Sequence, residues 1–161
     1  MVLDIAEMLK VLEEQKNTLE ELIDIADELS PALINDDIKA IVMITGRQEE
    51  KGRQMALMEQ KRRKLLEEYS LKTGLEIDYL DDLFCQISID EQEKLERLAF
   101  EIRKNHQQLQ EAQEHNSLLL KQSLVYVNRI LAFLHSRNPG IYSKSGKVNR
   151  AVRIGNIDKS I

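Results

Sequence analysis

The chain has 161 residues and a formal net charge of −5, with 32% charged residues, 4% aromatic residues, no Trp, six Gly and two Pro. Many charges combined with few aromatic residues and few turn formers are typical of long helices and disfavour an α/β enzyme. The negative charge gives no support to nucleic-acid binding. The acidic N-terminus is wrong for a signal peptide, the lone Cys85 fits a reducing cytosol, and no apolar run approaches the length of a membrane span. We therefore expect one cytoplasmic domain without membrane insertion.

The first predicted helix covers about residues 2–29. Its apolar residues recur at steps of three and four, as in a coiled-coil seam, and acidic residues dominate the positions between them. Ser30-Pro31 predicts an end or a kink, because the residue before a proline is pushed out of the helical region. The predicted seam consists of Ile5, Met8, Leu12, Leu19, Leu22, Ala26 and Leu29, with Gln15 as an interruption.

The second predicted helix covers about residues 36–70, and Asn35-Asp36-Asp37 offers its N-cap. Residues 46–54 contain two glycines and no apolar side chain, so the continuity of the helix stays open at that point. A basic cluster at residues 61–64 is expected to attract the acidic first helix in an antiparallel arrangement. The predicted buried side of this helix carries Met55, Met58, Leu65 and Leu66.

A short helix is predicted at residues 76–86, after a C-cap at Lys72-Thr73-Gly74. Ser88 and Glu91 have the spacing of a capping box and predict the start of a third helix at residues 89–137. Without an internal Gly or Pro, this helix would span roughly 70 Å. We expect an all-α fold: an elongated antiparallel three-helix bundle or coiled coil over residues 1–137.

The predicted C-terminal tail, residues 138–161, follows Asn138-Pro139-Gly140. Its apolar residues are scattered, so it cannot bury enough surface to offset its ordering entropy, and we expect it to be flexible. The charges of this tail are mostly basic: Lys144, Lys147, Arg150, Arg153 and Lys159 against Asp158.

No catalytic or metal-binding constellation is evident. His106, His115 and His135 lie on one predicted helix at intervals that do not converge on one metal ion, and the Glu-x-x-His pair of di-metal bundles is missing. The glycines match no phosphate-binding loop. The sequence therefore predicts a binding protein without a cofactor or a metal ion and not an enzyme.

The apolar stripe of the third helix widens toward its end, where most positions between Leu118 and Leu134 are apolar. A helix that is apolar over much of its circumference needs more than one neighbour, or a partner outside its own chain. Steps of seven from Leu95 place Asn116 and Ser123 on the seam. These polar residues either fix the register of a coiled coil or offer hydrogen bonds to a docking helix, and both alternatives stay open.

Three stretches together resemble the FlgN-type flagellar export chaperones. Residues 28–41 resemble the family's junction between its first two helices. Residues 114–131 resemble its third helix, with Asn116 before a leucine-rich run, and residues 142–146 resemble its short Tyr-x-x-x-Gly element. The resemblance implies a cytoplasmic chaperone that masks the amphipathic C-terminal helix of hook–filament junction proteins and delivers these clients to the type III export gate.

The stripe and the resemblance together predict the site residues. Tyr142 and Gly146 are expected at the export gate. The alternative function is a structural coiled-coil module that closes its apolar stripe by self-association, and a homodimer that exchanges its second copy for a client would combine both. The predicted client-binding residues are Asn116, Leu120, Leu124, Val127, Ile130, Leu131 and Leu134.

Overall fold

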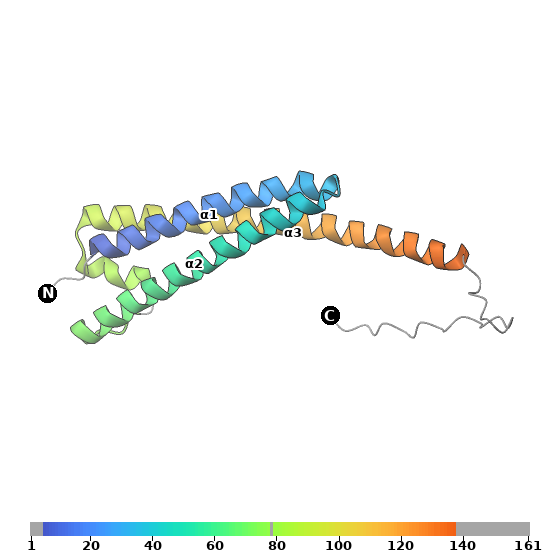
Figure 1. Cartoon of the computed structure of the whole chain (residues 1–161). Coiled ribbons are helices and arrows are strands. Elements are labelled where there is room, and N and C mark those ends of the chain that lie inside the picture. The colour runs from blue at the N-terminus through green and yellow to red at the C-terminus, as the bar shows by residue number, and fades with distance from the viewer. Residues whose placement is uncertain (1–4, 78, 138–161) are drawn as a thin grey trace, which may run out of the picture. The chain divides into compact units, whose positions relative to one another are not determined.

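The computed structural model describes residues 5–77 and 79–137, and all regular elements in these residues are helices. The predicted all-α fold is therefore confirmed (Figure 1). In chain order the elements are α1 (Ile5–Ile34), α2 (Ile38–Thr73), the 3-10 helix η1 (Leu80–Gln86) and α3 (Ile89–Arg137).

The chain divides into two compact units, residues 1–120 and residues 121–161. The first unit contains α1, α2, η1 and α3 as far as Leu120, and the second begins with the remainder of α3. The sequence placed the end of the bundle later, after residue 137. The predicted flexible tail from residue 138 onward lies outside the described residues.

Helix α1 continues through Pro31 to Ile34, which corrects the predicted end near Leu29. Pro31 removes the amide hydrogen bond to the residue four positions earlier, but it lies in the last turns of the helix, where this loss is limited. The helix continues because Ala32 and Leu33 are buried in an apolar cluster. Their burial offsets the local cost of the proline.

A three-residue turn reverses the chain between α1 and α2. The amide of Asp37 donates to the carbonyl of Ala32 at 3.0 Å, and the amide of Asp36 donates to that of Leu33 at 3.4 Å. This is the Schellman pattern, and Asp36 adopts the left-handed conformation that the pattern needs, with φ of 52°. The Asp37 side chain then accepts from the Ala40 amide at 3.1 Å, which confirms the predicted N-cap of α2.

Helix α2 is continuous through residues 46–54. A Cβ atom added at Gly46 or Gly52 would meet nothing within 4 Å, so both glycines lie on open surface. The helix ends at Gly74, which has a φ of 70° and donates its amide to Ser70 at 2.9 Å, as the predicted C-cap requires.

Three cross-helix ion pairs set α1 antiparallel to α2. Glu7 pairs with Lys61 at 3.3 Å, Glu21 pairs with Lys51, and Glu28 pairs with Arg47. The partner's number falls as the glutamate's number rises, which is the signature of antiparallel helices, and Figure 1 shows the two helices side by side. Within the basic cluster at residues 61–64, Lys61 forms the ion pair with α1. Such partly exposed pairs fix register more than they add stability.

The N-terminal cap of α3 agrees with the prediction, whereas the short helix before it differs. Ser88 and Glu91 form the capping box, with the Ser88 amide donating to Glu91 at 2.9 Å and the Glu91 amide donating to Ser88 at 3.4 Å. The predicted helix at residues 76–86 is a shorter 3-10 helix, η1, whose first turn is held by a 2.9 Å bond from the Tyr79 amide to Asp82.

Helix α1 is the central helix of the first unit, because it contributes buried residues to all three apolar clusters, whereas α2 and α3 each contribute buried residues to two. All seven residues of its predicted seam are buried. Full burial of one large apolar side chain stabilises the fold by about 1.5–3 kcal/mol. The cluster between α1, α2, η1 and α3 contains Met8, Leu12, Leu66, Tyr69, Ile77, Leu83, Leu95 and Leu98.

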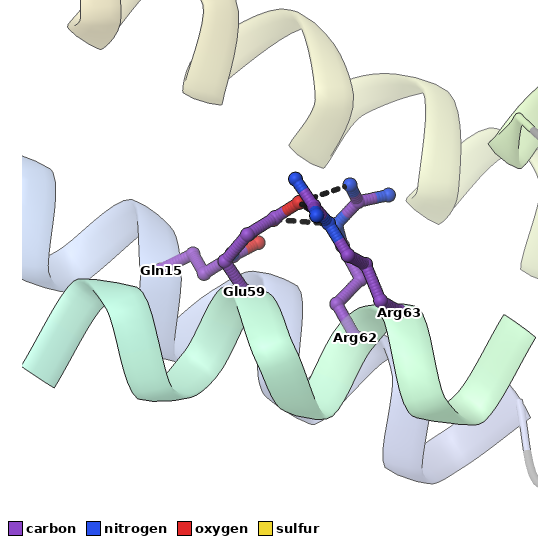
Figure 2. A network of polar contacts seen from close by, with 4 residues as sticks. All are labelled: Gln15, Glu59, Arg62 and Arg63. Atoms are coloured by element: carbon purple, nitrogen blue, oxygen red, sulfur yellow. Dashed lines mark hydrogen bonds and ion pairs between the residues drawn. The ribbon is translucent and has the colours of Figure 1, made fainter.

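A polar network lies between these helices, centred on Glu59 of α2 (Figure 2). Arg62 donates to both carboxylate oxygens of Glu59, at 2.7 and 2.9 Å, and Arg63 adds a third bond at 3.1 Å. The fourth bond comes from Gln15 of α1, at 3.2 Å. The bidentate bonds from Arg62, with the help of Arg63, lower the pKa of Glu59 to about 2. Gln15, an interruption in the predicted seam, thus links α1 to α2.

Candidate functional site

The seam of α3 is buried along the first part of the helix and exposed along the last part. Leu95 is fully buried, and Leu98 and Leu109 are nearly so. From Leu120 onward, the six predicted apolar client-binding residues keep 40–55% of their surface exposed: Leu120, Leu124, Val127, Ile130, Leu131 and Leu134.

These six side chains share one face of α3. Their spacing follows steps of three and four, and at about 100° per residue such steps return to the same side of a helix. Four further apolar residues lie on the other side of α3, and each is also at least half exposed: Leu118, Val125, Tyr126 and Phe133. This end of α3 therefore offers apolar surface on two faces, which explains why the stripe widens in the sequence.

Asn116 differs from the other predicted client-binding residues. Its side chain is 6% exposed and donates from Nδ2 to the Ala26 carbonyl at 2.7 Å. The Ser30 hydroxyl donates to its Oδ1, also at 2.7 Å. Both partners belong to α1. In the free chain, Asn116 therefore joins α3 to α1, and of the two alternatives left by the sequence the structure supports the register-fixing role.

An 18-residue window within residues 89–134 reaches a mean hydropathy of 1.2 and has no buried portion. By length and composition alone, such a helix could cross a membrane. An amphipathic helix that binds another protein has the same two properties, so this feature does not distinguish the two.

The two predicted export-gate residues, Tyr142 and Gly146, lie outside the described residues. Within those residues, no three His, Cys, Asp or Glu side chains gather as metal ligands.

Comparison with known proteins identifies one family. The family model described as "FlgN protein" matches residues 1–150. No curated protein and no solved structure matches the chain. The matched residues include the whole first unit and the exposed end of α3.

Proposed function

The chain belongs to the FlgN family of flagellar export chaperones, and from that premise we propose that the exposed end of α3 binds its client. The client is a hook–filament junction protein, and the bound segment is its amphipathic C-terminal helix. The chaperone acts in the cytoplasm, keeps this segment soluble and delivers it to the type III export gate.

The observation that carries the proposal is the exposure of the stripe from Leu120 to Leu134. Soluble proteins rarely expose contiguous apolar patches of this kind unless the patch binds a partner. An amphipathic client helix presents apolar residues at the same helical spacing, so the two faces can interlock as in a helix-in-groove complex. Burial of the exposed halves of these side chains supplies the binding free energy.

Asn116 enters the proposal as a register-fixing residue and not as a client contact. Because both hydrogen-bonding groups of its side chain are occupied by α1, it marks the end of the chaperone's own seam. The proposed client surface then begins at Leu120 and contains the remaining six predicted residues.

The test compares two double variants of neighbouring residues. Leu124→Asp with Val127→Asp alters the proposed client face, whereas Val125→Asp with Tyr126→Asp makes the same change in charge on the other side. All four residues are between 49% and 64% exposed. We expect the first variant to bind a purified junction protein at least about 100-fold more weakly, because it would bury two unpaired charges in the interface. The second variant should lose much less affinity. Equal losses would contradict the proposed face, and helicity by circular dichroism controls for unfolding.

Self-association is the alternative use of the same surface. The end of α3 exposes apolar residues on two faces, so a second copy of the chain could cover one of them. Sedimentation of the full chain over a range of concentrations measures it directly. If the stripe closes on a second copy, the dimer should dissociate when client is added, because both occupants need the same residues. A dimer that binds client without dissociating would place the client elsewhere.

The proposed gate contact rests on Tyr142, with Gly146 allowing the chain to turn beside it. Tyr142→Ala should leave client affinity unchanged and impair export of the client in cells. Normal export would contradict the gate role, and an equal loss of affinity and export would place Tyr142 in the client site.

A further inference from the structure

The two units of the chain carry opposite net charges. Residues 1–120 contain 15 Lys and Arg against 27 Asp and Glu, whereas residues 121–161 contain eight Lys and Arg against Asp158 alone. The net charge is therefore −12 for the first unit and +7 for the second, which together make the −5 of the whole chain. Such asymmetry within one chain points to an anionic partner of the basic part, which the overall acidity conceals.

In the second unit, one face of α3 combines cations with apolar side chains. Lys121, Val125, Arg129 and Phe133 follow one another at steps of four, so they lie along one side of the helix, and Tyr126 lies beside them. All five side chains are exposed, and the three apolar ones keep 50–64% of their surface. We call these five residues the basic face. It lies on the other side of α3 from the proposed client face, which contains no charged residue.

The cations of the basic face have no carboxylate to pair with. No Asp or Glu occurs in the sequence between Glu114 and Asp158. Neither Lys121 nor Arg129 forms an ion pair within residues 5–77 and 79–137. Both positive charges are therefore uncompensated in the described part of the chain and can attract an anionic surface.

We propose that the basic face of α3 binds the surface of a lipid bilayer that contains anionic headgroups. The charged ends of Lys121 and Arg129 meet the headgroup phosphates, and their aliphatic stems lie along the apolar layer below. Val125 and Tyr126 enter the boundary between headgroups and acyl chains, as apolar residues of interfacial helices do. Residues 138–161 add five cations and one carboxylate, which increases the attraction.

A lipid surface fits this combination better than the other anionic partners or a membrane span. Nucleic acid would neutralise the cations, but its phosphate backbone offers no apolar layer to the exposed aliphatic side chains. A transmembrane placement of the apolar window in α3 would bury Lys121 and Arg129 in hydrocarbon, which is costly. A helix that lies in the interface keeps both cations at the headgroups. The inference goes beyond client binding, because the two faces of α3 use different residues.

Two pairs of exposed cations on α3 test the charge. Lys121→Gln with Arg129→Gln removes both cations of the basic face, and Arg103→Gln with Lys104→Gln removes two exposed cations from the first unit. The probes are vesicles of equal parts phosphatidylglycerol and phosphatidylcholine, and vesicles of phosphatidylcholine alone. Flotation with the full chain measures binding. We expect the natural chain to bind the anionic vesicles at least about tenfold more tightly than the neutral ones, and this preference to shrink at high salt.

Lys121→Gln with Arg129→Gln should weaken binding to the anionic vesicles about ten- to thirtyfold, because each basic residue near such a surface contributes about fivefold. Arg103→Gln with Lys104→Gln should change it by less than about twofold. Equal losses in the two variants, or equal binding of the natural chain to both kinds of vesicle, would overturn the inference. So would tighter binding to a single-stranded RNA homopolymer than to the anionic vesicles, which would assign the cations to nucleic acid.

A second matched pair tests which face contacts the lipid and leaves the net charge unchanged. Val125→Ser with Tyr126→Ser alters the basic face, and Leu124→Ser with Val127→Ser alters the client face. The four side chains are 49–64% exposed. The basic-face variant should bind the anionic vesicles at least about fivefold more weakly and keep its affinity for a purified junction protein. The client-face variant should do the reverse.

A client-face variant that loses as much vesicle binding as the basic-face variant would overturn the assignment of the lipid to the basic face. Circular dichroism of both variants checks that the helix is retained. Client affinity is measured without vesicles, and vesicle binding without client, so failure of the lipid surface is distinguishable from failure of the client face.

Discussion

The two parts of α3, before and after Leu120, share one helical spacing of apolar residues but differ in burial. Leu95 and Leu109 are covered by the bundle, whereas Leu124 and Ile130 remain at least 40% exposed. The hydrophobic period determines which side chains share a face of a helix. It does not determine whether that face is covered by the chain itself or by a partner, and in α3 this difference separates structural residues from proposed functional ones.

Truncation of one leucine in each part gives the largest expected contrast. Leu95→Ala should lower the free energy of unfolding by about 3 kcal/mol, because it leaves a cavity in a closed core. Leu124→Ala should change it by less than about 0.5 kcal/mol in the free chain, because its side chain is 55% exposed. Urea unfolding of both variants measures the contrast. A similar cost for Leu124→Ala would mean that the stripe is already covered in the free protein.

Asn116 allows a test of where the chaperone's own seam ends. Asn116→Ala removes one buried and one partly buried hydrogen bond to α1 and should cost about 2 kcal/mol. Asn128 is an exposed asparagine further along the same helix, and Asn128→Ala should cost less than about 0.5 kcal/mol. If the two substitutions cost the same, Asn116 does not fix the register of α3 against α1.

The glycines offer a smaller effect with an internal control. Gly46→Ala and Gly52→Ala should each stabilise α2 by up to about 1 kcal/mol, because each lies in a helix with open space around it. Gly74→Ala should destabilise the fold, since an alanine is strained at a φ of +70°. Thermal unfolding of the three variants should give shifts of opposite sign. Destabilisation by Gly46→Ala would show that residues 46–54 need local flexibility.

A further expected effect is the pH dependence that comes from Glu59. Its pKa is lowered from 4.5 to about 2 in the folded chain. A carboxylate with a depressed pKa contributes stability above its unfolded pKa, and that contribution is lost as the pH falls from about 4.5 toward 2. Glu59→Gln should therefore lower the free energy of unfolding most at neutral pH. The difference in this free energy between the variant and the natural chain should shrink as the pH falls over this range. A difference that stays constant would exclude the charge of Glu59 as its cause.

Much of the fold follows from local sequence signals. Ser88 and Glu91 mark the start of α3, Gly74 marks the end of α2, and the period of three and four identifies the buried face of α1. Two local signals were outweighed by other interactions. Pro31 did not end α1 because the residues after it are buried, and residues 46–54 remained helical despite two glycines.

The sites are only partly predictable from the sequence. The widened stripe pointed to the apolar residues after Leu120. Steps of seven placed Asn116 on the seam, but they could not identify its partners on α1, because those partners are distant in the chain.

Amide hydrogen exchange along α3, with and without client, tests the central claim most directly. In the free chain at low concentration, amides of residues 121–134 should exchange faster than those of residues 95–116, because exposed helices open more readily than packed ones. Addition of a hook–filament junction protein should slow exchange at residues 121–134 and leave residues 95–116 nearly unchanged. Protection of residues 121–134 that is already complete without client, or that does not increase when client binds, would contradict the account.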